Sequence, residues 1–140
     1  MKTVLASLVV LLLAGTSPMA VAQDNESMVA IYNVSAGKHL EFLKWMAESE
    51  AVAKEAGAPP TQWYVHHQGA GWDFISITPQ LPSAQQDAVD KKDDEIRMKK
   101  GLPSGMAASL KFRQYIGGHS DTYAGGPYSA ADLVKMAEGK

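Results

Sequence analysis

Two neighbouring apolar segments, Thr61–His67 and Trp72–Thr78, constrain the fold of this chain more than any other feature. Both are rich in β-branched and aromatic residues, and the short glycine-containing loop between them predicts a β-hairpin. If the loop is Gln68–Gly71, opposed residues have numbers that sum to 139. Because side chains alternate along a strand, one face then carries Trp63, Val65, His67, Trp72 and Phe74, and the other carries Gln62, Tyr64, His66, Asp73, Ile75 and Ile77.

Neither face of this hairpin is polar, although one face of a half-exposed sheet should be. Helices of the same chain cover only one face, so the other needs a second cover. In a chain of 140 residues, the expected cover is a second copy of the chain. The sequence therefore predicts a homodimer formed through the sheet. The alternative is a sheet that its own helices cover on both sides.

The segments before the hairpin predict one strand and one helix. Met28–Val34 has the composition of a strand. From Lys38 to Glu55 apolar residues recur at helical spacing, and Gly57 ends the pattern.

After the hairpin, Ser83–Lys100 predicts a helix of mostly charged residues that ends at Gly101. Ser83 and Gln86 match a capping box at its start. Acidic and basic side chains nearly balance along it, so we expect a solvated helical insertion at residues 83–101 that binds no ligand.

The last part of the chain predicts two further helices. One begins after Ser104 and extends to Ile116, and a short one is capped by Ser129 and Asp132. Between them, residues 119–126 fit either a fourth strand or a loop.

Residues 1–22 show the features of a cleavable signal peptide in the expected order. Lys2 precedes the apolar run Val4–Ala14, and Ala20-Val21-Ala22 provides a cleavage site before Gln23. The run is shorter than the roughly 20 apolar residues of a membrane-spanning helix. We therefore expect an exported protein, periplasmic or secreted, whose residues 23–140 form one domain that does not bind membranes after signal cleavage.

The composition excludes several classes of function. A formal net charge of −2 gives no reason to expect nucleic acid or an anionic membrane as a partner. The chain contains no cysteine, so it has neither disulfides nor a cysteine nucleophile. It also lacks the motifs of serine hydrolases, nucleotide enzymes and zincins, and no motif calls for a cofactor.

His66 is the first candidate catalytic residue. In the hairpin register it lies opposite Asp73 and near Tyr64, where a carboxylate would fix the imidazole tautomer and raise its basicity. The alternative is a cross-strand contact without function. His39, in the first turn of the first helix, is expected at the surface.

His119 and Asp121 are the second candidate catalytic group. Two positions apart, they lie on one side of an extended chain, although a loop with local hydrogen bonds has the same sequence. If His66 converged with them, the three would form a two-histidine, one-carboxylate metal site. A metal- or haem-binding protein is therefore one alternative, and a non-enzymatic binding or structural module is another.

The candidate ligand-binding residues are Tyr32, Tyr64, Trp72 and Asp73. Aromatic side chains of this kind are more often part of a core than of a pocket. The sequence therefore leaves both roles open for the three aromatic residues.

The order strand, helix, aromatic hairpin, helix, with a helix entry at Ser35-Ala36-Gly37-Lys38-His39-Leu40-Glu41-Phe42, resembles the dimeric α/β-barrel superfamily of ferredoxin-like folds. That group includes antibiotic-biosynthesis-type monooxygenases and stress-responsive barrel proteins. The resemblance implies an α+β fold, an antiparallel sheet packed on helices. It also implies two protomers joined sheet to sheet around a small hydrophobic or aromatic molecule. For a catalytic member, the chemistry that it implies is cofactor-independent oxygenation or a related rearrangement, in which His66 or His119 would be the proton acceptor from an acidic substrate. Members differ in their active-site residues, so the resemblance itself assigns no catalytic role by position.

Overall fold

The computed structural model describes residues 26–69 and 71–139, so the expected signal peptide lies outside the described residues. Eight elements follow in the order β1 (Glu26–Val34), α1 (His39–Ala56), β2 (Gln62–Val65), β3 (Phe74–Pro79), α2 (Ser83–Lys100), α3 (Gly105–Arg113), β4 (Ile116–Gly125) and α4 (Ala130–Ala137). None of the helices in the described ranges combines the length and apolar character needed to span a bilayer.

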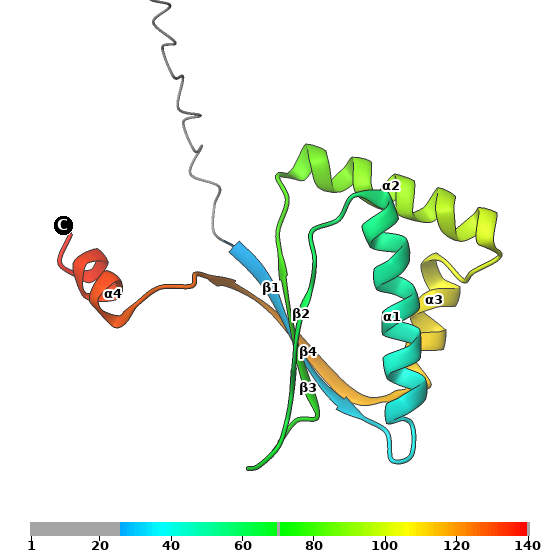
Figure 1. The fold of residues 1–140 in the computed structure, drawn as a ribbon, viewed down its shortest axis with the longest axis horizontal. Coiled ribbons are helices and arrows are strands. Elements are labelled where there is room, and N and C mark those ends of the chain that lie inside the picture. The colour runs from blue at the N-terminus through cyan, green and yellow to red at the C-terminus, as the bar shows by residue number, and fades with distance from the viewer. Residues whose placement is uncertain (1–25, 70, 140) are drawn as a thin grey trace, which may run out of the picture.

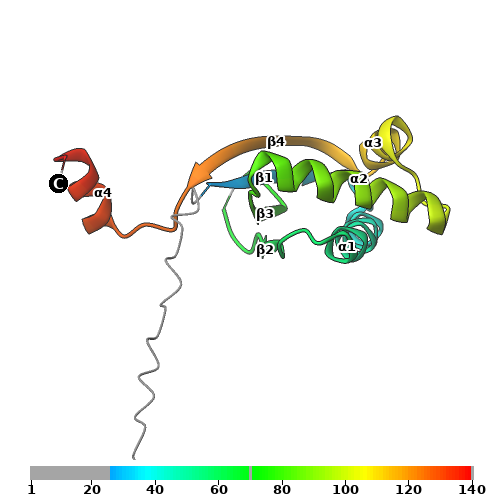
Figure 2. The same cartoon turned by 90° about the horizontal axis from the view of Figure 1, so that it is seen from above.

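The four strands form one antiparallel sheet in the order β2-β3-β1-β4. This order, with helices in both crossovers, is the ferredoxin-like α+β arrangement that the sequence predicted. Helices α1, α2 and α3 lie on one side of the sheet, and α4 lies on the other side, away from the body (Figures 1 and 2). We call the sheet face that points away from α1, α2 and α3 the open face.

The predicted hairpin register is confirmed. Gln62 pairs with Ile77 and Val65 pairs with Phe74, so paired numbers sum to 139. Both strands are shorter than predicted at the loop end, although the amide of His66 still donates to the carbonyl of Asp73 at 3.0 Å. On its other side Asp73 continues the pairing of β3 with β1, since its amide donates to the Tyr32 carbonyl at 2.8 Å.

The main core lies between the sheet and α1. Phe42 of α1 is fully buried against Ala30, Tyr32 and Val34 of β1 and Phe74 of β3. Half-buried side chains surround this cluster, namely Met46, Trp63, Phe112, Tyr115 and Ile116. The core is therefore built mainly from aromatic rings.

A second, smaller core joins α2 to α1. Val52 and Ala56 of α1 bury Ile96 of α2, with Val89 and Leu102 beside them. Most of α2 is exposed, as the charge pattern predicted, but Ile96 attaches it to the domain. The helical insertion is therefore not fully solvated, because one of its side chains packs against α1.

The predicted capping box of α2 is wrong. Pro82 is the N-cap, so Ser83 lies inside the first turn, and the side chain of Gln86 donates to Asp90 at 2.7 Å. The proline ring already holds the backbone in the conformation that precedes a helix. The predicted helix end is confirmed, because Gly101 adopts the left-handed conformation with φ of 66°.

The chain after α3 departs from the sequence prediction. The helix ends at Arg113, and Ile116 already begins β4, which pairs with β1 along most of its length. Residues 119–125 are therefore part of a strand. The capping box of α4 is confirmed, with the Ser129 hydroxyl accepting from the Asp132 amide.

The open face carries the apolar side chains Val29, Ile31, Ile75, Ile77 and Tyr64, while the alternate residues of the same strands face α1. Tyr64 is 49% exposed. Strand β4 adds smaller side chains to this face, Ser120, Thr122 and Ala124. The prediction that both faces are apolar is thus confirmed for β1 and the hairpin, and the described helices cover only one of them.

Phe42→Ala tests the main core. Removing a fully buried aromatic ring leaves a cavity, so we expect the free energy of unfolding to fall by about 3–5 kcal/mol. Urea denaturation followed by circular dichroism measures the change. The control is Met98→Ala on α2, whose side chain is 68% exposed and whose truncation should change stability by less than about 0.5 kcal/mol. Equal midpoints for the two variants would contradict the assignment.

Candidate functional site

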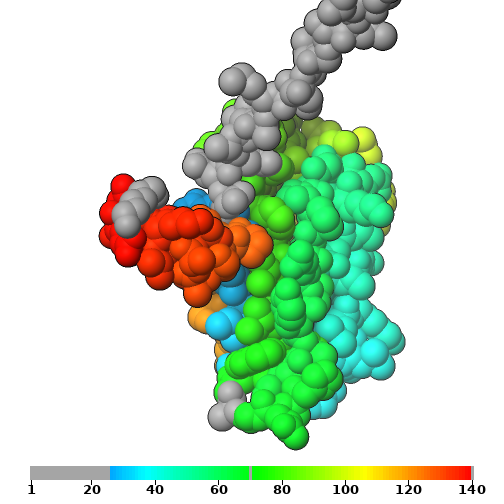
Figure 3. Space-filling model, turned by 60° about the vertical axis from the view of Figure 1, so that its left-hand side comes forward, coloured from blue at the N-terminus to red at the C-terminus, as the bar shows by residue number. Residues whose placement is uncertain are grey.

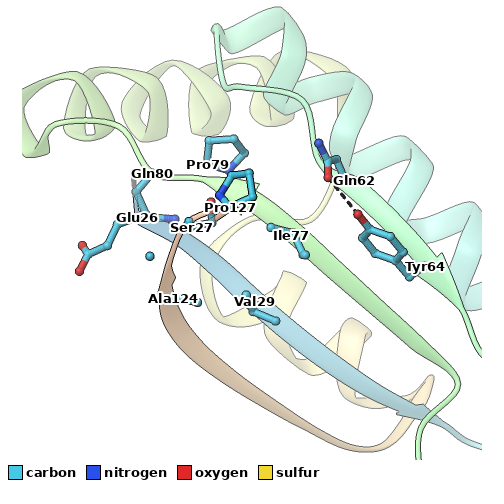
Figure 4. Close-up of a pocket in the computed structure, with 12 residues that line it drawn as sticks. Glu26, Ser27, Val29, Gln62, Tyr64, Ile77, Pro79, Gln80, Ala124 and Pro127 are labelled. Atoms are coloured by element: carbon cyan, nitrogen blue, oxygen red, sulfur yellow. Dashed lines mark hydrogen bonds between the residues drawn. The ribbon is translucent and has the colours of Figure 1, made fainter. Parts of the chain in front are cut away.

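A hollow on the open face is the first candidate site. It has a volume of about 410 Å³, within the range of roughly 300–1,000 Å³ typical of small-molecule sites. Its floor is formed by Val29, Ile77 and Tyr64, at the end of the sheet where β1 begins and β3 and β4 end. Figure 4 shows these side chains in front of the sheet, with the helices behind it.

The rim of this hollow is more polar than its floor. It is lined by Glu26, Ser27, Gln62, Pro79, Gln80, Ala124, Gly125, Gly126 and Pro127. The Tyr64 hydroxyl donates to Oε1 of Gln62 at 3.2 Å, which holds the phenol ring at the edge of the floor (Figure 4). An apolar floor with a few polar groups at the rim favours a small hydrophobic or aromatic molecule.

A row of three rings crosses the covered face of the sheet and forms the second candidate site. Tyr32 stacks on Trp63 with ring centroids 5.6 Å apart and on His119 with centroids 6.4 Å apart. Ser76 separates Trp63 from β1 in the register, and its small side chain leaves room for the indole to reach Tyr32. Phe112 of α3 meets the His119 ring edge to face at 5.3 Å. We call Trp63, Tyr32 and His119 the ring row.

Polar partners fix the ring row at both ends and in the middle. The indole N–H of Trp63 donates to the carboxylate of Glu50 on α1. The Tyr32 hydroxyl lies 3.3 Å from Oγ of Ser76. Burial raises the pKa of the Tyr32 phenol above its ordinary value, the Ser76 hydrogen bond opposes this, and the carboxylates of Asp121 and Glu50 add to the rise. Tyr32 is therefore a neutral phenol at physiological pH.

The two predicted residues His119 and Asp121 do lie together on one side of β4. Nε2 of His119 is 3.4 Å from Oδ2 of Asp121, and both side chains are partly exposed. A shallow hollow of about 340 Å³ adjoins His119 and is lined also by Arg113, Ile116, Gly117 and Gly118. This pair can accept a proton from a molecule bound beside β4.

The expected pairing of the His66 imidazole with the Asp73 carboxylate is replaced by other contacts. Oδ2 of Asp73 accepts from the Val34 amide at 2.6 Å, and its Oδ1 lies 3.3 Å from Nε2 of His39. The His66 ring packs on Trp72 instead, with centroids 5.0 Å apart. The register placed His66 and Asp73 opposite each other correctly, but the hydrogen bond from the Val34 amide orients the carboxylate away from His66.

Besides Asp73, six side chains were predicted to take part in catalysis or ligand binding. These six do not form one site. Tyr64 lies in the open-face hollow, and Tyr32, His119 and Asp121 lie on the covered face. His66 and Trp72 lie at the loop end of the hairpin.

A shared metal site of His66, His119 and Asp121 is not formed. His66 follows β2 and the other two lie on β4, which are the opposite edges of the sheet. Three strand spacings of about 4.8 Å separate these edges by about 14 Å. Within the described ranges, no group of three or more histidine or acidic residues is placed to hold a metal ion.

Several residues of the two sites were not predicted from the sequence. Val29 and Ile77 form the floor of the hollow, and strand alternation beside Tyr64 was the available signal for Ile77. Glu50 and Phe112 reach the ring row from helices, and a contact between a helix side chain and a strand side chain has no local sequence pattern.

Fold and site together define a ferredoxin-like α+β protein with an apolar hollow on its open face. No protein-family model matches the sequence, and no curated protein matches it. The similarity of this chain to known proteins therefore lies in its three-dimensional structure.

Three solved structures illustrate the similarity. A NIPSNAP domain protein from Burkholderia xenovorans superposes with a TM-score of 0.51 at 14% identity, covering 75% of this chain and 96% of that one. A NIPSNAP family protein from Agrobacterium tumefaciens gives 0.51 at 17%, with 77% and 90% covered. A variant of SnoaB, a cofactor-independent oxygenase from Streptomyces nogalater, gives 0.50 at 13%, with 76% and 97% covered. These similarities confirm the ferredoxin-like fold.

Asp73→Asn tests the junction of β1, β3 and α1. The Val34 amide first, and His39 second, lower the pKa of Asp73 below its ordinary value. Its contribution to stability is therefore complete above the unfolded pKa of about 3.9, and it is lost as pH falls through the lower folded value. We expect the variant to be less stable than the wild type at pH 7 and the difference to shrink toward about pH 2. Urea midpoints across this range measure it, and a constant difference would contradict the role of the charge.

Proposed function

We propose that this chain is an exported, homodimeric protein that binds a small hydrophobic or aromatic molecule in the open-face hollow. The observation that carries the proposal is the apolar floor of Val29, Ile77 and Tyr64, which the described helices leave uncovered. Export rests on the expected signal peptide at residues 1–22.

We infer a homodimer because exposing the apolar side chains of the open face to water is unfavourable in free energy. Ile31 and Ile75 extend the apolar surface along the sheet beyond the hollow, and a contiguous surface of this kind marks an interface. A second copy offers the same surface, so a two-fold arrangement covers both at once. The hollow then lies at the junction of the two sheets, where bound ligand is shielded from water.

Ile77→Trp and Ile31→Asp test binding and pairing separately. Ile77→Trp fills the hollow, so we expect the dimer to persist and the affinity for 1-anilinonaphthalene-8-sulfonate to fall about tenfold or more, which corresponds to about 1.4 kcal/mol. Ile31→Asp places a charge on the open face beyond the hollow, so we expect a monomer. Light scattering and probe fluorescence measure the two properties.

Met98→Trp and Met98→Asp on the exposed side of α2 are the matched controls and should behave as the wild type. A wild-type protein that is monomeric at every concentration would refute the pairing. Unchanged probe affinity in Ile77→Trp would refute the site.

A second candidate function uses the other face of the sheet. The contact between His119 and Asp121 beside a hollow near Arg113 favours removal of a proton from an acidic aromatic substrate. Cofactor-independent oxygenation is the corresponding reaction class, since the fold is shared with a protein described as such an oxygenase. In this scheme His119 accepts the phenolic proton, and Asp121 stabilises the imidazolium. The ring carbon of the resulting anion then forms a bond to dioxygen, which takes up the electron pair, and the imidazolium returns the proton to give a hydroperoxide. Loss of water from the hydroperoxide leaves a quinone, so one oxygen atom enters the product and the other leaves as water.

His119→Ala tests this second function with 2-naphthol as the probe. We expect the wild type to raise the phenolate fraction of the probe, seen in its absorption spectrum, and to consume oxygen, and the variant to lose both. His67→Ala, at an exposed loop position, is the control and should retain both. Equal oxygen uptake with and without His119 would exclude the imidazole as proton acceptor.

A further inference from the structure

The C-terminal helix α4 carries apolar side chains that the described chain leaves largely exposed to water. No residue of α4 is buried, and Leu133, Val134 and Met136 are each more than half exposed. Figures 1 and 2 show the helix standing apart from the sheet, and in Figure 3 the red segment projects from the strands.

The sequence of α4 is that of a helix made to pack on a surface. At helical spacing, Leu133, Val134 and Ala137 fall on one side and Lys135 falls on the other. Its N-terminus is closed by a complete capping box, in which the Asp132 carboxylate accepts from the Ser129 amide at 3.1 Å. An isolated helix needs about 12–15 residues to be even marginally stable in water, and α4 has 8. The helix therefore requires a partner surface.

The position of α4 indicates where that partner lies. The chain leaves β4 through Gly125, Gly126 and Pro127, which line the rim of the open-face hollow. From there α4 extends on the side of the sheet to which the open face points (Figure 1). A molecule seated on the open face therefore lies on the same side of the sheet as α4.

The area of the open face alone is small for a stable dimer. Four strands about 4.8 Å apart, averaging about seven residues of about 3.3 Å, give a flat footprint of about 450 Å². A standard interface buries about 800 Å² on each partner. One helix of this length covers about 12 by 10 Å, and because each copy gives one helix and receives one, α4 adds about 240 Å². On the same flat measure, α4 adds about half as much area again as the open face itself.

We propose that α4 is an arm that packs its apolar side on a second copy of the chain and closes the hollow at the junction of the two subunits. This inference rests on the dimer of the proposed function. Leu133 and Met136 then become part of the wall around the bound molecule, so the binding site is incomplete in one chain alone.

Leu133→Asp tests the arm, with Ala131→Asp on the polar side of the same helix as the matched control. We expect Leu133→Asp to raise the dimer dissociation constant about tenfold or more and to weaken probe binding, because it places a charge in an apolar contact worth at least about 1.4 kcal/mol. Ala131→Asp should leave both properties unchanged. Light scattering over a dilution series and probe fluorescence provide the measurements.

Met136→Cys labelled with bimane locates the partner, since the chain has no other cysteine. We expect a blue-shifted emission in the dimer that turns red on dilution and in the Ile31→Asp background. A blue shift that persists in that monomer means that α4 packs on its own chain and overturns the inference.

Two further outcomes separate the arm from the proposed function. If the wild type is a dimer and Ile31→Asp a monomer, while Leu133→Asp pairs like the wild type, the arm is refuted and the proposed function stands. If α4 instead binds vesicles of phosphatidylglycerol and Leu133→Asp abolishes only that binding, the helix belongs to a lipid surface and the arm is again refuted. A wild type that never dimerises removes both proposals.

Discussion

The packing of Phe42 against Tyr32 and Phe74 determines how the rest of this molecule is arranged. This contact fixes α1 to one side of the sheet. Once that side is filled with aromatic rings, the alternate residues of the same strands necessarily point the other way. The apolar open face, the hollow on it and the need for a further cover are all consequences of the side on which Phe42 is buried.

Much of the fold could be predicted because its determinants are local. The length of the glycine-containing loop predicted the register of β2 and β3 correctly. Gly57 and Gly101 marked the ends of their helices, where both adopt the left-handed conformation. Strand β4 was harder to predict because its glycines and polar residues have low strand propensity. It is a strand because β1 offers it a long row of backbone partners, and such tertiary pairing has no local signature.

The candidate sites were less predictable, and Asp73 shows why. The register places Asp73 opposite His66. A register describes backbone positions, however, and does not determine which rotamer the side chain adopts. The amide of Val34 competes for the carboxylate and binds it at 2.6 Å. A buried backbone donor without a partner costs about 1–3 kcal/mol, so satisfying it outweighs a contact with the half-buried imidazole of His66. Such competition depends on residues that are distant in the sequence.

Ser76 has a consequence for how this scaffold divides its space. Its short side chain lets the indole of Trp63 lie across β3 and reach Tyr32, so the volume between sheet and α1 is occupied by the protein's own rings. A related chain with a bulkier residue at this position and a smaller one in place of Trp63 would have a vacant chamber under the helix instead. The side chains at positions 63 and 76 therefore decide whether the space under α1 is filled, whereas the hollow on the open face is lined by other residues and does not depend on them.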